Sequence, residues 1–371
     1  MVKLLPFLFA ATFPAAAATV RIENVPEDGL QPQALSGRDG TIHLVYLKGD
    51  PRSCDVRYVQ RKAGGSDWSP PVSVNSEAGS AIAIGTIRGA QIALSKKGRL
   101  HVVWNGAMKE GGDSHGSPLY YTRFDPEESR FEPQRNVLGD TRALDGGASV
   151  ASNEDGNVFI VWHGQTPEKA GEGSRAVFTL RSSDHGETFE GPDIANADFP
   201  GVCACCSLKA LLTPTGEIFI LYRSALTVRD RDMTLLSSRG AGEPFSRRLL
   251  DSWETPACPM SSAAMIAGPS GIHGAWETDG RIRSAILGKG IEPLEFGEGQ
   301  AKHPVLVMNV HGETLLAWAR GTGWERGGAL AWVVLDRAGA PTGEPGTADG
   351  VRVWSWVSAF AEPDGSFVIL R

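Results

Sequence analysis

The sequence predicts an all-β fold, a β-propeller of four-stranded antiparallel blades. Three observations predict it. First, a short apolar motif recurs along the whole chain. Second, the 371 residues include 45 glycines and 23 prolines, a composition that fits many short strands joined by turns. Third, no segment has the apolar periodicity of an amphipathic helix of useful length. Seven copies of the motif favour seven blades. Six blades remain the alternative, because the seventh copy has no visible third strand.

Each copy of the motif is a turn glycine followed by a β-branched or apolar run, as in DGTIHLVYLKG (39–49) and KGRLHVVWNG (97–106). The glycines, 41 to 60 residues apart, are Gly40, Gly98, Gly156, Gly216, Gly271, Gly312 and Gly365. Six positions later, five copies have an aromatic residue: Tyr46, Trp104, Trp162, Tyr222 and Trp318. Further apolar strands flank each run, giving the four strands of one blade. Two separate β-sandwiches would not explain one period along the whole chain.

The two ends of the chain carry different predictions. Residues 1–18 resemble a signal peptide, with Lys3, an apolar run over 4–13 and small residues over 15–18. We therefore expect a secreted or periplasmic protein in which residues 19–371 form a single propeller domain. The segment TVRIENV (19–25) is expected to complete the last blade beside the C-terminal hairpin.

Net charge and hydropathy argue against nucleic acid and membranes as partners of this protein. The formal charge of −7 provides no basic patch for nucleic acid or an anionic membrane surface. The N-terminal apolar run is too short to span a bilayer, and no later segment is apolar enough. We expect neither nucleic acid nor membrane as a partner once the signal peptide is removed.

The stretch RSSDHGETFEGP (181–192) contains the pattern Ser-x-Asp-x-Gly-x-Thr-Phe, from Ser182 to Phe189. It resembles the Asp box, or BNR repeat, of the sialidase superfamily, which lies between the third and fourth strands of a blade. GGSDWSPP (64–71) and EESRFEPQ (127–134) are weaker copies. The chain is thus similar to exported sialidase-like propellers. This resemblance implies a carbohydrate-active hydrolase of the exo-glycosidase type, acting on anionic glycans.

Strand direction predicts which loops meet at the central channel. If the strands of a blade alternate in direction, the connections entering the innermost strands share one face with the connections between second and third strands. Ligand sites of propellers usually lie on that face. The entering connections contribute Arg88, Gln91, Asp145, Cys203, Cys205, Cys206, Lys209, Cys258 and His303. The second set contributes Asn105, His163, Arg223, Glu277 and Arg320.

The resemblance also implies roles for these residues. Sialidases hold a substrate carboxylate with three arginines and use a tyrosine nucleophile assisted by a glutamate, with an aspartate as acid/base. A planar guanidinium suits a carboxylate because it donates two parallel hydrogen bonds. The expected arginine cluster is Arg88, Arg223 and Arg320. The expected catalytic groups are Asp145, Glu277 and Tyr222, and further substrate-binding residues are Gln91, Asn105 and His163.

A non-catalytic propeller is the alternative. The first blade lacks the Arg-Ile-Pro motif in which sialidases carry their first arginine. A glycan-binding module would present aromatic platforms and no paired carboxylates; the candidate platforms are Trp253, Trp324, Trp354 and Trp356. An enzyme would bring two carboxylates and an arginine to one open pocket.

Three of the five cysteines lie in GVCACCS (201–207). In an exported chain, Cys203, Cys205, Cys206 and Cys258 are expected to form one or two disulfides that tie the fourth blade to the fifth. Copper or zinc bound by the same sulfurs is a second interpretation, and a reactive thiol a third. Cys54 is left as the unpaired thiol. No other cofactor is predicted.

Overall fold

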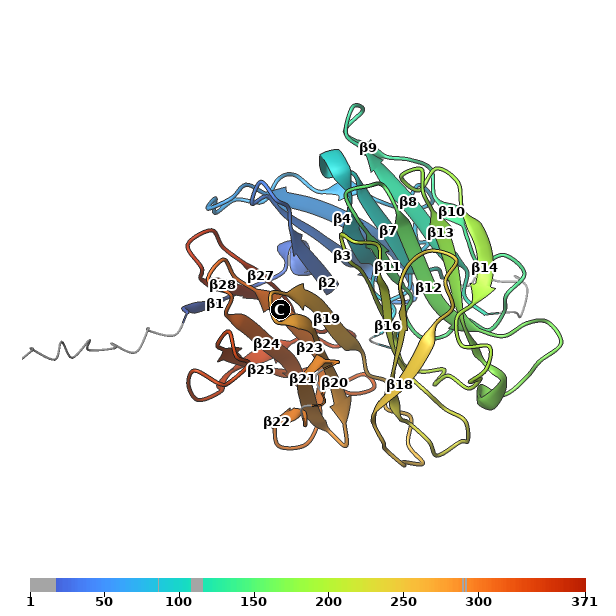
Figure 1. Ribbon diagram of the computed structural model, residues 1–371. Coiled ribbons are helices and arrows are strands. Elements are labelled where there is room, and N and C mark those ends of the chain that lie inside the picture. The colour runs from blue at the N-terminus through green and yellow to red at the C-terminus, as the bar shows by residue number, and fades with distance from the viewer. Residues whose placement is uncertain (1–17, 86, 108–115, 289, 291) are drawn as a thin grey trace, which may run out of the picture.

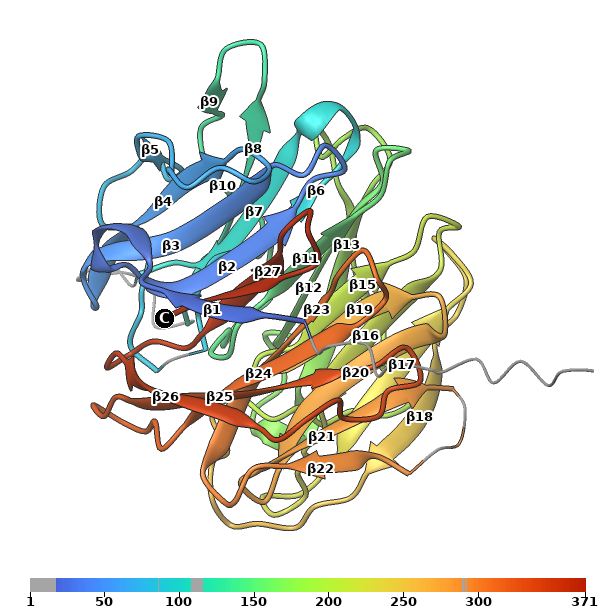
Figure 2. The ribbon, with the colours of Figure 1, turned by 90° about the vertical axis from the view of Figure 1, so that its left-hand side faces the viewer.

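Seven β-sheets follow one another around a central axis in sequence order (Figures 1 and 2). The structure is a computed structural model that describes residues 18–85, 87–107, 116–288, 290 and 292–371. Apart from Ala18, the predicted signal peptide lies outside these residues. The all-β propeller with seven blades is confirmed, and the alternative of six is excluded.

The blades are numbered by their innermost strands along the chain. Blade 1 contains β2 (Leu30–Ser36), β3 (Ile42–Asp50), β4 (Ser53–Arg61) and β5 (Val72–Ser73). Blade 2 contains β6 (Gln91–Leu94), β7 (Leu100–Asn105), β8 (Leu119–Asp125), β9 (Arg130–Phe131) and β10 (Arg135–Asn136). Blade 3 contains β11 (Ser149–Ser152), β12 (Val158–Gly164), β13 (Ala176–Ser182) and β14 (Glu190–Ile194). Blade 4 contains β15 (Lys209–Leu212), β16 (Ile218–Arg223), β17 (Met233–Ser238) and β18 (Ser246–Asp251).

The remaining blades complete the ring. Blade 5 contains β19 (Ala263–Gly268), β20 (Gly271–Thr278), β21 (Arg281–Leu287) and β22 (Leu294–Phe296). Blade 6 contains β23 (Ala301–Met308), β24 (Thr314–Arg320), β25 (Gly328–Leu335) and β26 (Gly346–Val351). Blade 7 contains β27 (Ser358–Ala361), β28 (Phe367–Leu370) and β1 (Val20–Glu23). The helical segments are the short 3₁₀ turns η1 (Pro26–Asp28), η2 (Lys96–Gly98) and η3 (Glu172–Ser174). Within the described residues, no helix has the length and apolar character needed to cross a membrane.

The two ends of the chain close the ring. β1 pairs in parallel with β28, so that Val20 lies opposite Phe367 and Glu23 opposite Leu370. Blade 7 therefore has three strands, two from the C-terminus and one from the N-terminus, as the sequence predicted. Figure 2 shows β1 beside the last blade, and β27 in turn contacts β2 of blade 1.

The second strand of each blade is buried along most of its length. β7 and β12, for example, are buried at every position, because neighbouring blades cover both faces of the sheet. This explains why the repeat reads as a continuous apolar run rather than as an alternating pattern. The recurrent aromatic residues are at most 1% exposed: Tyr46, Trp104, Trp162, Tyr222, Trp276 and Trp318.

Aromatic side chains that lie between the third and the outermost strand of a blade pack neighbouring blades together. Each packs against an aromatic ring of the preceding blade, with ring centroids 5.0 to 6.5 Å apart. The pairs are Trp68 with Phe360, Phe131 with Tyr58, Phe189 with Tyr121, and Phe245 with Phe159.

The turn from Ser182 to Phe189 has the predicted local hydrogen bonds between β13 and β14. The Ser182 hydroxyl accepts from the Gly186 N–H at 2.9 Å, and the Asp184 carboxylate accepts from the Thr188 N–H at 3.0 Å. These bonds satisfy turn backbone groups and hold Phe189 against the neighbouring blade. The segment thus has a structural role.

Candidate functional site at the channel mouth

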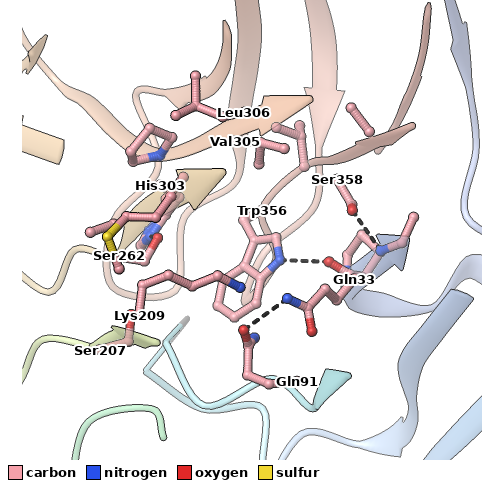
Figure 3. A pocket seen from close by; sticks show the side chains of 18 of the residues that line it. Gln33, Gln91, Ser207, Lys209, Ser262, His303, Val305, Leu306, Trp356 and Ser358 are labelled. Carbon is pink, nitrogen blue, oxygen red and sulfur yellow. Dashed lines mark hydrogen bonds between the residues drawn. The ribbon is translucent and has the colours of Figure 1, made fainter. Parts of the chain in front are cut away.

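The connections into the innermost strands surround one end of the central channel. A cavity of about 220 Å³ begins there and runs between the innermost strands of six blades, from β2, β6, β15, β19, β23 and β27 (Figure 3). Polar side chains lie near the start of these strands or, for Gln33, in the middle of β2: Gln33, Gln91, Ser207, Lys209, Ser262 and His303. Apolar side chains line the strands beyond: Leu35, Ile92, Ile266, Leu306 and Val307. Only the mouth is suited to a polar ligand.

Hydrogen bonds fix the polar groups of this cavity. Gln33 donates from its amide nitrogen to the amide oxygen of Gln91 at 2.9 Å, and the indole N–H of Trp356 donates to the Pro32 carbonyl at 2.8 Å. The Ser262 hydroxyl lies 3.3 Å from Nδ1 of His303. Burial lowers the pKa of His303 to about 3, and the nearby Lys302 ammonium adds to this effect. His303 is therefore neutral at physiological pH.

Lys209 is the one charged side chain among the described residues that line the cavity. It is the first residue of β15 and faces the same space as Gln33 and Gln91 in Figure 3. Burial lowers its pKa to about 8, because the charged ammonium loses solvation there. Lys209 is still mostly protonated at pH 7, and its charge is not paired with a carboxylate in the cavity wall.

Arg88, Asp145 and Asn105 come together beside the cavity, as predicted. The Arg88 guanidinium pairs with the Asp145 carboxylate and also donates to the Asp145 carbonyl at 2.8 Å. The Asn105 amide donates to the carbonyl of Gly146 at 3.1 Å. Both side chains of this ion pair are only partly buried: Arg88 is 18% exposed and Asp145 41% exposed.

His163 supports the same loop from within. Its Nδ1 lies 3.1 Å from the guanidinium of Arg175, which also donates to the Ala143 carbonyl at 2.6 Å. Burial, followed by the charge of Arg175, lowers the pKa of His163 to about 3. The loop can approach this closely because of Gly146, where an added Cβ would lie 2.0 Å from the Cys206 carbonyl oxygen. His163 is buried and holds the loop rather than lining the cavity.

Arg223 and Glu277 form a second, deeply buried pair. Each is 2% exposed, and their charged groups lie 3.8 Å apart. Arg223 also donates to the carbonyls of Arg231 and Glu277, while the Gly280 N–H donates to the Glu277 carboxylate at 2.8 Å. Burial raises the pKa of Glu277, and the Arg223 charge opposes that rise. Trp253 packs against this guanidinium, with its ring centroid 5.0 Å away.

Tyr222 and Arg320 are not brought together with the other predicted residues. The Tyr222 ring belongs to the hydrophobic core between blades 3 and 4 and is 1% exposed. It is one of the recurrent buried aromatic residues of the second strands described above. Arg320 ends β24 with an exposed side chain and does not line the cavity. The three arginines of the expected carboxylate-binding cluster therefore occupy three different environments.

The predicted aromatic platforms also separate. Trp356 lines the cavity, and Trp253 packs on Arg223. Trp324 is 61% exposed and meets the buried Trp354 edge to face, with centroids 4.7 Å apart. Trp324 is thus the one candidate that presents an exposed ring.

The predicted tie between blades 4 and 5 is present as a Cys205–Cys258 disulfide, with Cα atoms 6.4 Å apart. Cys203 and Cys206 are free thiols, with Sγ atoms 3.2 Å apart. The sulfurs of Cys203, Cys205 and Cys206 lie within 4.8 Å of one another. Cys54 is a free, buried thiol, as expected, and burial raises its pKa to about 12.

Sequence reasoning missed several residues of this region. Gln33 lies within β2, where nothing distinguishes it from a solvent-facing strand residue until the register is known. Arg175, Arg231 and Glu172 come from long connections between second and third strands. The many charged residues of those loops are the sequence feature that could have indicated them. Glu172 pairs with Arg231 at 2.9 Å and accepts from the Ala204 N–H at 2.9 Å, which supports the cysteine segment.

Comparison with known proteins gives the fold. No protein-family model and no curated protein matches the chain. Among solved structures, the Hadza microbial sialidase Hz136 is similar with a TM-score of 0.54 at 15% identity, over 78% of this chain and 63% of that one. The chain is therefore similar to this sialidase in its β-propeller fold.

Two further structures show how widely this fold is used. The Trypanosoma rangeli sialidase has a TM-score of 0.55 at 10% identity, over 80% of this chain and 53% of that protein. The α-L-arabinanase of Penicillium chrysogenum has a TM-score of 0.54 at 12% identity, over 88% and 100%. The propeller spans only about two thirds of the length of the Hadza sialidase and about half that of the Trypanosoma enzyme. At these identities the similarity extends to the fold alone.

Proposed function

We propose that the protein binds an acidic sugar residue at the mouth of its channel. The observation that carries this proposal is the cavity lining: amide and hydroxyl groups at the mouth, the indole of Trp356, and Lys209 as the only charged side chain among the described lining residues. Carbohydrate hydroxyls need such donors and acceptors, and an ammonium adds preference for a carboxylate. Several solved propellers of this fold are named as glycoside hydrolases, which supports a carbohydrate ligand.

The size of the cavity limits the ligand. About 220 Å³ is less than the roughly 300–1,000 Å³ of pockets that enclose drug-sized ligands. One terminal sugar residue suits this space better than an internal segment of a chain. We propose that the ligand is the acidic end of a glycan, met by an exported form of the protein.

Binding without catalysis is the form of this function that the geometry favours. A hydrolase of the predicted type needs a pair of carboxylic groups facing one ligand. The cavity lining contains no carboxylate among the described residues, Asp145 is paired with Arg88, and Glu277 is buried against Arg223. An exo-glycosidase using Asp145, Glu277 and Tyr222 would require these groups to rearrange.

Calorimetric titration of the purified protein at pH 7 tests the proposal. The probes are glucuronic, galacturonic and N-acetylneuraminic acids, with glucose and galactose as neutral references. We expect at least one acid to bind about ten-fold or more tightly than the neutral sugars, a factor typical of a hydrogen bond to a charged group. Lys209→Met should remove this preference. The exposed Lys62→Met is the matched control and should retain it.

Two further results make the test decisive. Affinity for the acid should fall as the pH rises through about 8, because Lys209 loses its charge there. Equal binding of acidic and neutral sugars, or an unchanged Lys209→Met variant, would contradict the proposal. Fluorogenic glycosides of the same acids test turnover: hydrolysis that is lost in Asp145→Asn would restore the enzymatic interpretation.

A further inference from the structure

Four sulfur atoms form a continuous row at the channel mouth. The Cys206 Sγ lies 3.2 Å from the Cys203 Sγ, which lies 3.5 Å from the Cys205 Sγ, and Cys205 is bonded to Cys258. The row runs from the interior to the surface, since Cys203 and Cys206 are buried and Cys258 is exposed. A buried dithiol thus touches a disulfide whose far end is accessible to solvent.

The backbone holds the sulfurs of residues 203 to 206 in this row independently of the disulfide. The Cys203 N–H donates to the Arg223 carbonyl at 3.0 Å, and the Ala204 carbonyl accepts from the Gly146 N–H at 2.8 Å. Just beyond, the Ser207 N–H donates to the Ser261 carbonyl at 3.2 Å. Blades 3, 4 and 5 therefore all position the segment, so the thiols would keep their places if the disulfide opened.

The charges around the dithiol favour one thiolate. Burial opposes ionisation of Cys206, but the S–H of Cys203, donating to its sulfur, and the Arg223 guanidinium together lower its pKa. The pKa of Cys203 is raised, because its S–H donates a hydrogen bond to Cys206 and because burial disfavours the charged thiolate. Deprotonation activates a thiol for disulfide exchange, so the Cys206 thiolate can serve as the base for Cys203, the thiol that lies 3.5 Å from the Cys205 sulfur.

We propose that the four cysteines form a thiol–disulfide exchange site in which the disulfide moves between the exposed pair Cys205–Cys258 and the buried pair Cys203–Cys206. The proposed binding of an acidic sugar does not require this exchange. Its partner would be an external thiol or disulfide, meeting the exposed Cys258.

The exchange is balanced without an added oxidant. Cys206, present as the thiolate, takes the proton of Cys203 while the Cys203 Sγ attacks the Cys205 Sγ. The Cys205–Cys258 bond breaks, and its electron pair leaves on Cys258, which takes a proton from water. Cys206 then attacks the Cys203 Sγ; the Cys203–Cys205 bond breaks, and Cys205 leaves with the electron pair and takes up the proton that Cys206 releases. One disulfide and two reduced cysteines are present before and after, and one proton is taken up from water. The exposed dithiol Cys205/Cys258 can then reduce an external disulfide.

A metal ion is the competing occupant of these sulfurs. With Cys205 and Cys258 bonded to each other, only two thiols remain, and their 3.2 Å separation is shorter than the roughly 3.8 Å between two sulfurs that each lie about 2.3 Å from a tetrahedral zinc ion. The sulfurs as arranged here suit exchange better than coordination. The experiment distinguishes the two.

Peptide mapping of the folded protein follows the exchange directly. The protein, holding one disulfide, is incubated without oxygen in glutathione buffers of graded ratio, quenched with acid, alkylated and digested with trypsin. Cys203, Cys205 and Cys206 fall on one tryptic peptide and Cys258 on another. We expect two one-disulfide species: the cross-linked pair of peptides, and a free Cys258 peptide together with an internally bridged Cys203–Cys206 peptide.

Variants identify the step. Cys203→Ser should abolish the second species, whereas Cys54→Ser, at the remote buried thiol, should leave both. Finding only the Cys205–Cys258 species at every ratio in the wild-type protein would overturn the proposal, whether or not a variant folds. So would one equivalent of zinc or copper in the purified protein that blocks alkylation of all four cysteines until a chelator is added.

Discussion

The mouth contains two arginine–carboxylate pairs that differ in burial and in the other groups they contact. Arg88 and Asp145 are 18% and 41% exposed, and the arginine is shared between a carboxylate and two carbonyls. Arg223 and Glu277 are each 2% exposed and sit under Trp253, next to the cysteine segment. The first pair can exchange its partner for a ligand at little cost, while the second is part of the framework. An arginine in a loop of the functional face is therefore not by itself a ligand-binding arginine.

Removing one member of the buried pair should have the largest effect. Arg223→Met leaves the Glu277 carboxylate buried without a partner, and we expect a loss of roughly 3–5 kcal/mol in the free energy of unfolding. Guanidinium chloride unfolding at pH 7 measures it. Arg223→Met/Glu277→Met should be less destabilised than the single variant. A single variant as stable as the wild type would show that Arg223 is not needed for the framework.

The disulfide on the same side of the mouth should come next. Cys205 and Cys258 are 53 residues apart, and Cys258→Ser removes the cross-link between blades 4 and 5. We expect a loss of roughly 2–4 kcal/mol, chiefly from greater freedom of the unfolded chain. Thermal unfolding of the oxidised proteins tests this, with Cys54→Ser for comparison. An equal loss in both variants would indicate a packing effect of the serine rather than loss of the cross-link.

Acid should lower the free energy of unfolding through His163, which supports the loop that carries Asp145. The pKa of His163 is about 3 in the folded protein against an ordinary 6.5, so the unfolded chain binds the extra proton first as the pH falls. Its contribution is complete above pH 6.5 and declines below it, by about 2 kcal/mol at pH 5. His163→Asn keeps an acceptor for Arg175 and does not titrate, so unfolding curves between pH 7 and 5 should show a shallower decline. An unchanged pH dependence would contradict this assignment.

The exposed pair should show the smallest change in stability and a separate change in affinity. Arg88→Ala is expected to cost about 1 kcal/mol or less in unfolding free energy. If an anionic ligand extends to this arginine, its binding should weaken by roughly 1.5–3 kcal/mol. Arg38→Ala, which breaks an exposed pair with Glu154 in another loop, is the matched control. A large stability loss with unchanged affinity would make Arg88 structural as well.

The fold was predictable because its signal is repeated. Seven glycine-plus-strand motifs gave the seven sheets, and the strand at 19–25 gave the closing pair of β1 and β28. Loop position also predicted that Cys258 would meet the cysteine segment and that Arg88 and Asp145 would lie on one face, but not that they would pair with each other. These conclusions need only strand order and direction.

The site was less predictable because it depends on side-chain direction and burial. Tyr222 satisfied the expected residue type, but its place in the repeat directs it into the core between blades. Glu277 lies at a strand end on the correct face, yet it turns inward to Arg223, 54 positions earlier in the chain. Gln33 and Lys209 share a cavity only because of the register and tilt of the innermost strands. None of this is encoded in a local pattern.

The parallel pairing of β1 with β28 makes the ring depend on both ends of one molecule. β1 is the first strand in the sequence and its partner β28 is the last, so blade 7 cannot assemble until both strands are available. Removal of β1 would expose the edge of β28, which could then pair with a strand of another copy. The last blade is therefore the one whose assembly needs the two strands that lie furthest apart in the sequence.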